Sequence, residues 1–319
     1  MKKFFLFGIL SLFILTSCKT EATKTEKKTV TEESSKYKFS LAQWSLHKEL
    51  FAGKKDPMNF AQDAKDLGFT GLEYVSQLYV SDAVNYPMKN KGLTEILKEL
   101  KKRSDSLGMD NLIVMIDNEG DLSFSDEEET QKAIENHKKW IDAAAFLGCH
   151  SIRINLFGDP DPETWVKNSV RSLKDLGEYG ATKNVNILVE NHGGLSSNGA
   201  LLARVMKEVN MNNCGTLPDF GNFCVKREGG ARWSAPCVEE YDKYKGMEEL
   251  MPFAKGVSAK SYDFNEAGDE TTLDYYKMIN IVNKSNFEGY IGIEYEGEDP
   301  IPGIKATKAL VEKAIKQQK

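Results

Sequence analysis

Eight apolar stretches, rich in β-branched and aromatic residues, recur along the chain with a helical pattern between each and the next. They begin roughly every 30 to 40 residues, the length expected of one strand–helix unit. The expected strands are 39–44, 71–75, 111–117, 151–157, 187–192, 215–220, 256–262 and 290–296. Gly68, Gly108 and Gly148 stand where three of the helices should end. Eight such units predict an α/β fold of one domain, the (β/α)8 TIM barrel.

A doubly wound open sheet is the alternative architecture for alternating strands and helices. A Gly-rich phosphate loop commonly follows the first strand of such a sheet, and this sequence has none there. In a barrel, the active site is built from residues at the carboxyl ends of the strands. Those residues are therefore the ones to inspect for chemistry.

The N-terminal part has a different character. Lys2 and Lys3 precede an apolar run that is too short to span a bilayer, which predicts a secretory signal over residues 1–17. The following Cys18, after small residues, resembles the lipobox of bacterial lipoproteins. That resemblance implies lipidation of Cys18 and an exported protein at the periplasmic or outer membrane. Residues 19–36 are mostly Lys, Thr, Glu and Ser, which predicts a flexible tether over residues 18–37. A plain signal peptide with an incidental cysteine is the alternative. The barrel domain would cover residues 38–319.

Charge and cysteine content narrow the function classes. The formal net charge is −6, and loss of Lys2 and Lys3 makes it more negative, which argues against a nucleic-acid partner. Outside the signal, no pair of cysteines has CxxC spacing, so a structural zinc site is not expected. Cys224 and Cys237 fall in one loop region, where export would permit a disulfide, and two free thiols remain the alternative. Whether the chain forms a homo-oligomer is left open.

Polar residues stand at the end of nearly every expected strand. Strand five offers Glu190 and His192, and strand six offers Asp219 with Asn222 in the next turn. The other strand-end candidates are Trp44, Glu73, Asp117, Arg153, Asn155, Ser258, Lys260, Glu294 and Glu296. Because side chains alternate along a strand, residues two apart share one side of the barrel wall.

Three of these acids raise an electrostatic question. Glu190, Asp219 and Glu294 would surround one opening, where like charges raise each other's pKa or repel. A divalent cation bound by oxygen ligands would remove the conflict. The alternative is that the acids pair with Arg153 and Lys260 at a solvated rim.

The motifs "VENHGG", "PDFGN" and "GIEYEG", in this order on a barrel, resemble the sugar phosphate isomerase/epimerase-like superfamily, the xylose isomerase-like TIM barrels. The resemblance covers about residues 38 to 316. It implies one divalent metal, with Mn²⁺ favoured and Mg²⁺, Co²⁺ or Zn²⁺ left open. Its ligands would be Glu190, Asp219, position 258 and Glu294. Ser258 departs from the family's histidine, whereas Lys260 matches a lysine common in the family.

The resemblance implies an exported sugar isomerase or epimerase that removes a proton next to a sugar carbonyl. Glu190 and Glu294 would transfer the proton and Lys260 would assist. The substrate contacts would come from His192, Arg153, Asn155, Trp44, Glu73 and Asn222. The enediolate that this proton removal leaves would also be the intermediate of a lyase, eliminase or hydratase acting on 3-keto-glycosides. We expect the loop from 225 to 246, which carries Trp233, to cover the barrel mouth, or else to be a surface insertion.

The sequence also bears on two other functional classes, a nuclease and a sugar-binding protein. A nuclease of the endonuclease IV type needs a histidine-rich site for three metal ions, and the chain has only 4 histidines. A lipid-anchored sugar-binding protein without catalysis stays open, because Ser258 replaces the expected histidine. The expected partner in every surviving case is a small sugar or keto-sugar derivative, together with the membrane through Cys18.

Overall fold

The structure, a computed structural model, describes residue 1 and residues 36–318. The predicted signal segment and the lipidation site at Cys18 lie outside the described residues. Lys36–Lys319 form one compact unit. Its first strand begins at Tyr37, one residue before the predicted domain boundary.

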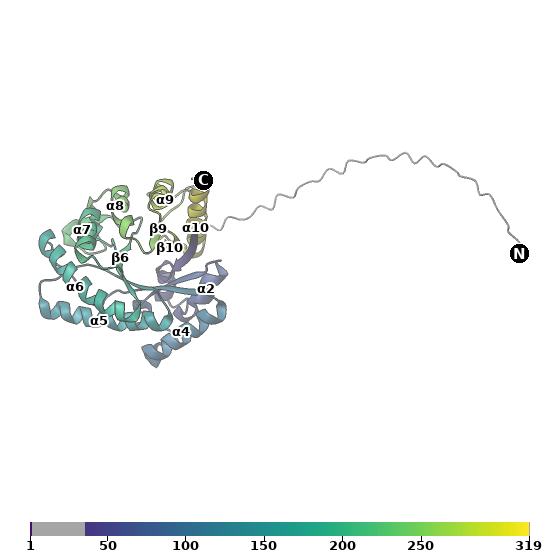
Figure 1. The fold of residues 1–319 in the computed structure, drawn as a ribbon, viewed down its shortest axis with the longest axis horizontal. Helices are drawn as coiled ribbons and strands as arrows, with labels where there is room; N and C mark the ends of the chain where they lie inside the picture. The colour runs from purple at the N-terminus through teal and green to yellow at the C-terminus, as the bar shows by residue number, and fades with distance from the viewer. Residues whose placement is uncertain (2–35, 319) are drawn as a thin grey trace. The chain divides into compact units, whose positions relative to one another are not determined.

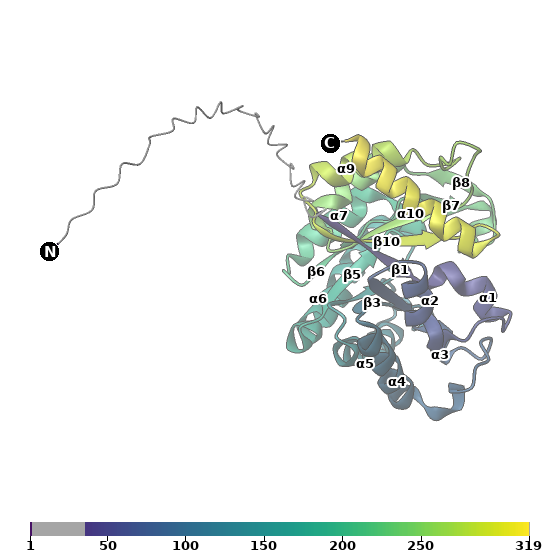
Figure 2. The same ribbon diagram turned by 90° about the vertical axis from the view of Figure 1, so that its right-hand side faces the viewer.

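Eight parallel strands form the barrel (Figures 1 and 2). They are β1 (Tyr37–Ala42), β2 (Gly71–Val75), β3 (Asp110–Met115), β4 (Ser151–Ile154), β5 (Asn186–Glu190), β6 (Cys214–Leu217), β9 (Val257–Ser261) and β10 (Gly289–Tyr295). The hydrogen-bonded order is β6-β5-β4-β3-β2-β1-β10-β9. The remaining gap, between β6 and β9, is closed by two isolated parallel bridges, Thr216 with Ala254 and Asp219 with Ser258. The predicted TIM barrel is therefore confirmed.

Helices cover the outside of the strands, as Figure 1 shows. They are α1 (His47–Phe51), α2 (Phe60–Asp66), α3 (Gln77–Val80), α4 (Leu93–Leu107), α5 (Glu127–Leu147), α6 (Pro162–Lys183), α7 (Gly199–Val209), α8 (Lys243–Leu250), α9 (Tyr275–Lys284) and α10 (Pro300–Gln317). Asp126 and Asp161 cap α5 and α6 by accepting a backbone N–H three residues on. Gly108 and Gly148 end α4 and α5 in the left-handed conformation, at the predicted stops. No described helix, within residues 36–318, is long and apolar enough to cross a membrane.

Several strands end earlier than predicted, and two of these early ends lie at the site. β5 ends at Glu190 and β6 at Leu217, so His192 and Asp219 lie beyond the ladder. The reason is the side chain of Asn191, which binds backbone groups in place of a strand. Its Oδ1 accepts from the N–H of Asp219 at 2.8 Å, and its Nδ2 donates to the carbonyl of the same residue at 3.0 Å. The amide thus replaces two ladder hydrogen bonds while the main chain turns away.

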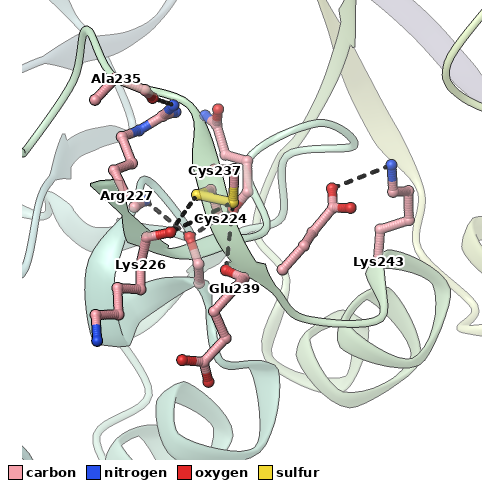
Figure 3. The surroundings of a disulfide bond; sticks show 11 residues. Cys224, Lys226, Arg227, Ala235, Cys237, Glu239 and Lys243 are labelled. Atoms are coloured by element: carbon pink, nitrogen blue, oxygen red, sulfur yellow. Dashed lines mark hydrogen bonds and ion pairs between the residues drawn. A yellow bond between two sulfur atoms is a disulfide. The ribbon is translucent and has the colours of Figure 1, made fainter. Parts of the chain in front are cut away.

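The loop after β6 is an ordered hairpin. β7 (Cys224–Arg227) and β8 (Cys237–Glu240) pair antiparallel, and α8 begins at Lys243. A disulfide joins Cys224 to Cys237, as the sequence permitted (Figure 3). Arg227 Nη1 donates to the carbonyl of Ala235 at 2.8 Å and braces the tip. The segment expected to be a loop is therefore a covalently closed hairpin.

Candidate active site

A cavity of about 740 Å³ opens at the carboxyl ends of the barrel strands, where the fold predicts an active site. Arg153, Lys260 and Glu294 border it from the strands. Trp44 and Trp233 border it from the turns and from the hairpin. It therefore combines buried charged groups with aromatic surfaces that suit a polar ligand with apolar faces.

Lys260 and Glu294 form the first charged cluster. They are direct partners in the β9–β10 register, so the barrel itself places the ammonium beside the carboxylate. Lys260 Nζ lies 2.9 Å from Glu294 Oε1 and 3.0 Å from Glu296 Oε1. Trp44 Nε1 donates to the same oxygen of Glu296 at 2.8 Å. Burial alone would lower the pKa of Lys260, but the two carboxylates outweigh it and hold that pKa well above its usual value.

Arg153 organises a second cluster on β4. Its Nη1 lies 2.9 Å from Asp117 Oδ1, and its Nε lies 2.8 Å from Glu190 Oε2. The Nε contact lacks hydrogen-bond geometry, so it is an ion pair only. Glu190 Oε1 accepts from Asn222 Nδ2 at 2.9 Å. Burial raises the pKa of Glu190 despite these partners. At Asp117 burial acts the same way, but Arg153, His192 and Asn155 together outweigh it and lower the pKa.

Asp219 is held by donors of its own turn. Ser258 Oγ donates to Oδ2 at 2.6 Å, and the backbone N–H groups of Gly221 and Asn222 donate to Oδ1 at 2.8 and 2.9 Å. Burial raises the pKa of Asp219 to about 8 even though these bonds favour the charged form. This carboxylate therefore fixes the turn after β6 and the closure of the barrel.

Glu73 lies inside the barrel and does not border the cavity, in contrast to its predicted role in substrate binding. Ser40 Oγ donates to its Oε1 at 2.6 Å, and Oε2 has no hydrogen-bond partner. Burial raises the pKa of Glu73 to about 7. Gly292 leaves it room, since a Cβ there would come within 2.5 Å of Oε1. Its side chain fills the barrel interior, which is why the cavity does not reach it.

His192 and Asn155, two of the predicted substrate contacts, border the cavity with Arg153. Asn155 Nδ2 donates to Asp117 Oδ1 at 2.8 Å, which leaves its Oδ1 as an acceptor for His192 Nδ1 at 2.7 Å. Burial lowers the pKa of His192 to about 3, and Arg153 adds to the effect. The ring is therefore neutral, with the proton on Nδ1 and Nε2 as its acceptor.

Aromatic rings stand at two places on the cavity wall. Trp44 stacks on His47 with ring centroids 4.2 Å apart. Trp233, on the hairpin, packs against Phe157 at 5.2 Å and His192 at 4.9 Å. Trp233 therefore joins the hairpin to the strand ends.

A surface ion pair fixes the same hairpin. Arg232 pairs with Asp121 at 2.6 Å and lies over the ring of Phe157. Together with Trp233, this contact holds the hairpin at the cavity, which Arg227, Arg232 and Trp233 border.

The predicted metal ligands are not assembled as a set. Within residues 36–318 no group of three or more His, Cys, Asp or Glu side chains is placed to hold a metal ion. Glu190 is paired with Arg153, Glu294 with Lys260, and Asp219 with Ser258. A divalent site needs several oxygen or nitrogen ligands free to face one point. The donor set as placed does not fit one.

Four residues have roles at the site that the sequence did not predict. Glu296 and Asp117 each bind a buried cation, and both were visible as strand-end acids. Arg232 borders the cavity but stands in a hairpin with no strand-end signal. Asn191 shares a motif with Glu190, and only the closed barrel shows that its role is structural. Conversely, Glu190 and Asp219 do not themselves border the cavity.

Residues 61–317 match the family model described as xylose isomerase-like TIM barrel. The chain belongs to this family. The match spans most of the barrel, from α2 to α10. It confirms the superfamily that the three sequence motifs resemble.

Solved structures of the same fold include a 3-keto-D-glucoside 4-epimerase from E. coli, with TM-score 0.63 and 14% identity over 87% of this chain and 99% of that one. A sugar phosphate isomerase/epimerase from Parabacteroides distasonis has TM-score 0.65 and 17% identity over 91% and 99%. The IolI protein, solved with a zinc atom, has TM-score 0.66 and 12% identity over 88% and 98%.

One curated protein matches over a short segment. The C-glycoside deglycosidase alpha subunit of Arthrobacter globiformis is 31% identical over 77 residues, which is 22% of each chain. The matched part is therefore a small fraction of that protein's length.

Proposed function

We propose that the protein is a sugar isomerase or epimerase that removes a proton next to the carbonyl of a sugar or sugar derivative. The main support for this proposal is the position of Glu294. It is a buried carboxylate on the cavity wall, with Lys260 Nζ 2.9 Å from its Oε1. Burial raises the pKa of Glu294, which makes it a stronger base than an exposed glutamate. A bound sugar would place the C–H next to its carbonyl against the carboxylate oxygens of Glu294.

The remaining steps use groups around Glu294. As the proton moves to the carboxylate, the C–H electron pair shifts toward the carbonyl and an enediolate forms. Lys260 stabilises the negative charge on the former carbonyl oxygen. Neutral His192 accepts a hydrogen bond from a sugar hydroxyl through Nε2. Trp44 and Trp233 offer ring faces to the sugar. The predicted Mn²⁺ has no step here, because its three predicted carboxylate ligands are already paired.

Epimerisation also needs a group that returns the proton on the opposite face. We assign this role to Glu190, three strands away from Glu294 around the barrel. The side chain of Asn222 borders the cavity and donates to Glu190 Oε1 at 2.9 Å. A sugar hydroxyl that replaces this amide would bring Glu190 into contact with the substrate. Burial raises the pKa of Glu190, which favours its protonated form compared with an exposed glutamate.

Elimination from a 3-keto-glycoside is the second candidate. The same enediolate would expel a β-oxygen if the substrate carries one. The cavity of about 740 Å³ has room for a sugar with a substituent, within the usual range of about 300–1,000 Å³ for ligand pockets. The names of two similar proteins, a keto-glucoside epimerase and a C-glycoside deglycosidase subunit, support this substrate class.

Proton-exchange NMR in D₂O with a panel of keto-sugars and 3-keto-glucosides tests the proposal. Wild type should exchange the proton next to the carbonyl, and Glu294→Gln should slow exchange by about 100-fold or more. Glu298→Gln is the matched control, since this exposed glutamate lies four residues on and outside the cavity. Binding without exchange in wild type would instead identify a sugar-binding protein. Exchange that survives Glu294→Gln would overturn the assignment of the base.

We also propose export and a lipid anchor at Cys18, which rest on the sequence of the first 18 residues. Mass spectrometry of the N-terminal peptide should find an acylated Cys18. The Cys18→Ser variant should leave the membrane fraction. An intact N-terminus at residue 1 in the mature protein would contradict this.

A further inference from the structure

Two positively charged side chains are buried at the barrel mouth, and each contacts two carboxylates. Arg153 contacts Asp117 and Glu190, at 2.9 and 2.8 Å. Lys260 contacts Glu294 and Glu296, at 2.9 and 3.0 Å. The side chains of Arg153 and Lys260 are only 5% and 1% exposed. Each pair of acids at this mouth therefore shares one cation of the chain itself, which neutralises part of their charge.

These contacts leave little place for a divalent ion. An ion bound to Glu190 and Glu294 would lie close to both Arg153 and Lys260. Two unit charges of like sign 4 Å apart repel by about 4 kcal/mol at an effective dielectric constant of 20, and a divalent ion doubles that cost. The fixed cations would thus oppose the metal at two of its three predicted carboxylate ligands.

The third predicted ligand, Asp219, is already fully engaged. Both of its oxygens accept hydrogen bonds from its own turn and from Ser258. Ser258 stands where the family resemblance implies a histidine ligand, and it acts as a donor toward Asp219. Position 258 therefore closes the barrel in this chain.

We infer that Arg153 and Lys260 take the place of the divalent metal, and that this site works without one. Lys260 then supplies the electrophile. Its ammonium has three hydrogens. One is donated to Glu296 at 3.0 Å, Glu294 is held as an ion pair at 2.9 Å, and the remaining donor capacity serves a substrate oxygen in the cavity that Lys260 borders. The statement about turnover rests on the proposed function, whereas the statement about metal binding does not.

Metal content and thermal stability test the inference without any substrate. Untagged wild-type protein is purified without chelator and analysed by inductively coupled plasma mass spectrometry. Its Tm is then measured with EDTA, Mn²⁺, Mg²⁺, Co²⁺ or Zn²⁺. We expect far less than one metal ion per chain and the same Tm in every condition, because a ligand that binds the native state raises Tm. A stoichiometric metal, or a Tm that rises by several degrees with one of these ions, would overturn the inference.

The Lys260→Met variant tests the part played by the ammonium. It leaves Glu294 and Glu296 without their cation, so Mn²⁺ should now raise its Tm where wild type shows no shift. A variant as indifferent to metal as wild type would show that Lys260 is not what replaces the ion. If the proposed function holds, the variant also loses about 100-fold in kcat, the cost of one oxyanion donor. The Tm comparison stands even if no sugar on the panel reacts, and wild-type metal content stands even if the variant does not fold.

Discussion

Lys260 and Trp233 border one cavity, yet Lys260 is 1% exposed and Trp233 is 45% exposed. Lys260 is positioned by the β9–β10 register and two carboxylates. Trp233 is positioned by a hairpin that depends on a disulfide and a surface ion pair. The cavity thus has a floor, the two clusters around Arg153 and Lys260, and a rim, the hairpin from Cys224 to Glu240. Changes in the floor should cost global stability and chemistry, whereas changes in the rim should alter substrate binding.

The largest effect is expected from breaking the floor. Lys260→Met removes one partner of a buried ion pair and should lower the free energy of unfolding by about 3–5 kcal/mol, because the carboxylates remain buried without compensation. Urea denaturation followed by circular dichroism measures it. The double variant Lys260→Met/Glu294→Gln should recover part of the loss. No recovery would mean that Lys260 acts through packing rather than charge.

A second change tests the barrel interior beneath the floor. The pKa of Glu73 is raised to about 7, so the folded state favours its neutral form. The stabilising contribution is complete below the unfolded pKa, near 4.5, and is lost as pH rises through about 7. Glu73→Gln should therefore match wild type at low pH and exceed its stability above neutrality by about 3 kcal/mol. Urea titrations across this pH window measure the difference, and an unchanged pH slope in the variant would refute the assignment.

Opening the rim should affect binding. The double variant Cys224→Ser/Cys237→Ser frees the hairpin, so KM should rise about tenfold while kcat changes little, since the floor is intact. Steady-state kinetics on the substrate found by NMR provide the measurement. Cys149→Ser is the control, because this buried cysteine is a free thiol away from the hairpin. A fall in kcat with unchanged KM would place the hairpin in the chemical step.

The smallest effect is expected from one aromatic ring. Trp233→Ala should weaken sugar binding by about 1 kcal/mol, the usual value of an aromatic contact. Isothermal titration calorimetry with the same ligand measures it. Phe146→Ala is the matched control, since this ring is 46% exposed and lies on α5 outside the cavity. Equal losses in both variants would remove Trp233 from the binding surface.

The floor and the rim also differ in how far the sequence predicts them. Strand periodicity places Lys260 and Glu294 at the same end of neighbouring strands, and the family match confirms that architecture. The sequence allowed two interpretations of the clustered acids: they bind a metal, or they form ion pairs with Arg153 and Lys260. The choice depends on side-chain distances across β9 and β10, which are set by closure of the whole barrel. The ion pairs of the second interpretation are present, but they are buried, whereas that interpretation placed them at a solvated rim.

The strand ends and the hairpin were harder to predict. Asn191 stops β5 by binding the backbone of Asp219, and nothing in a single sequence distinguishes it from a site residue. The cysteine spacing permits the disulfide, but the antiparallel pairing of β7 with β8 has no strong apolar alternation to signal it. The burial pattern agrees, because all four residues of β8 are exposed. Local patterns therefore predict which strand ends lie at the cavity, and miss the paired hairpin and the amide that stops β5.

The bridge between Asp219 and Ser258 has a consequence for protein engineering. It lies at the seam where β6 meets β9, which is joined by isolated bridges and not by a full ladder. A histidine at position 258 would supply a potential metal ligand and at the same time remove the hydroxyl that ties the seam to Asp219. Metal affinity and barrel closure are thus traded against each other at a single residue. A designer who wants the first must strengthen the seam elsewhere.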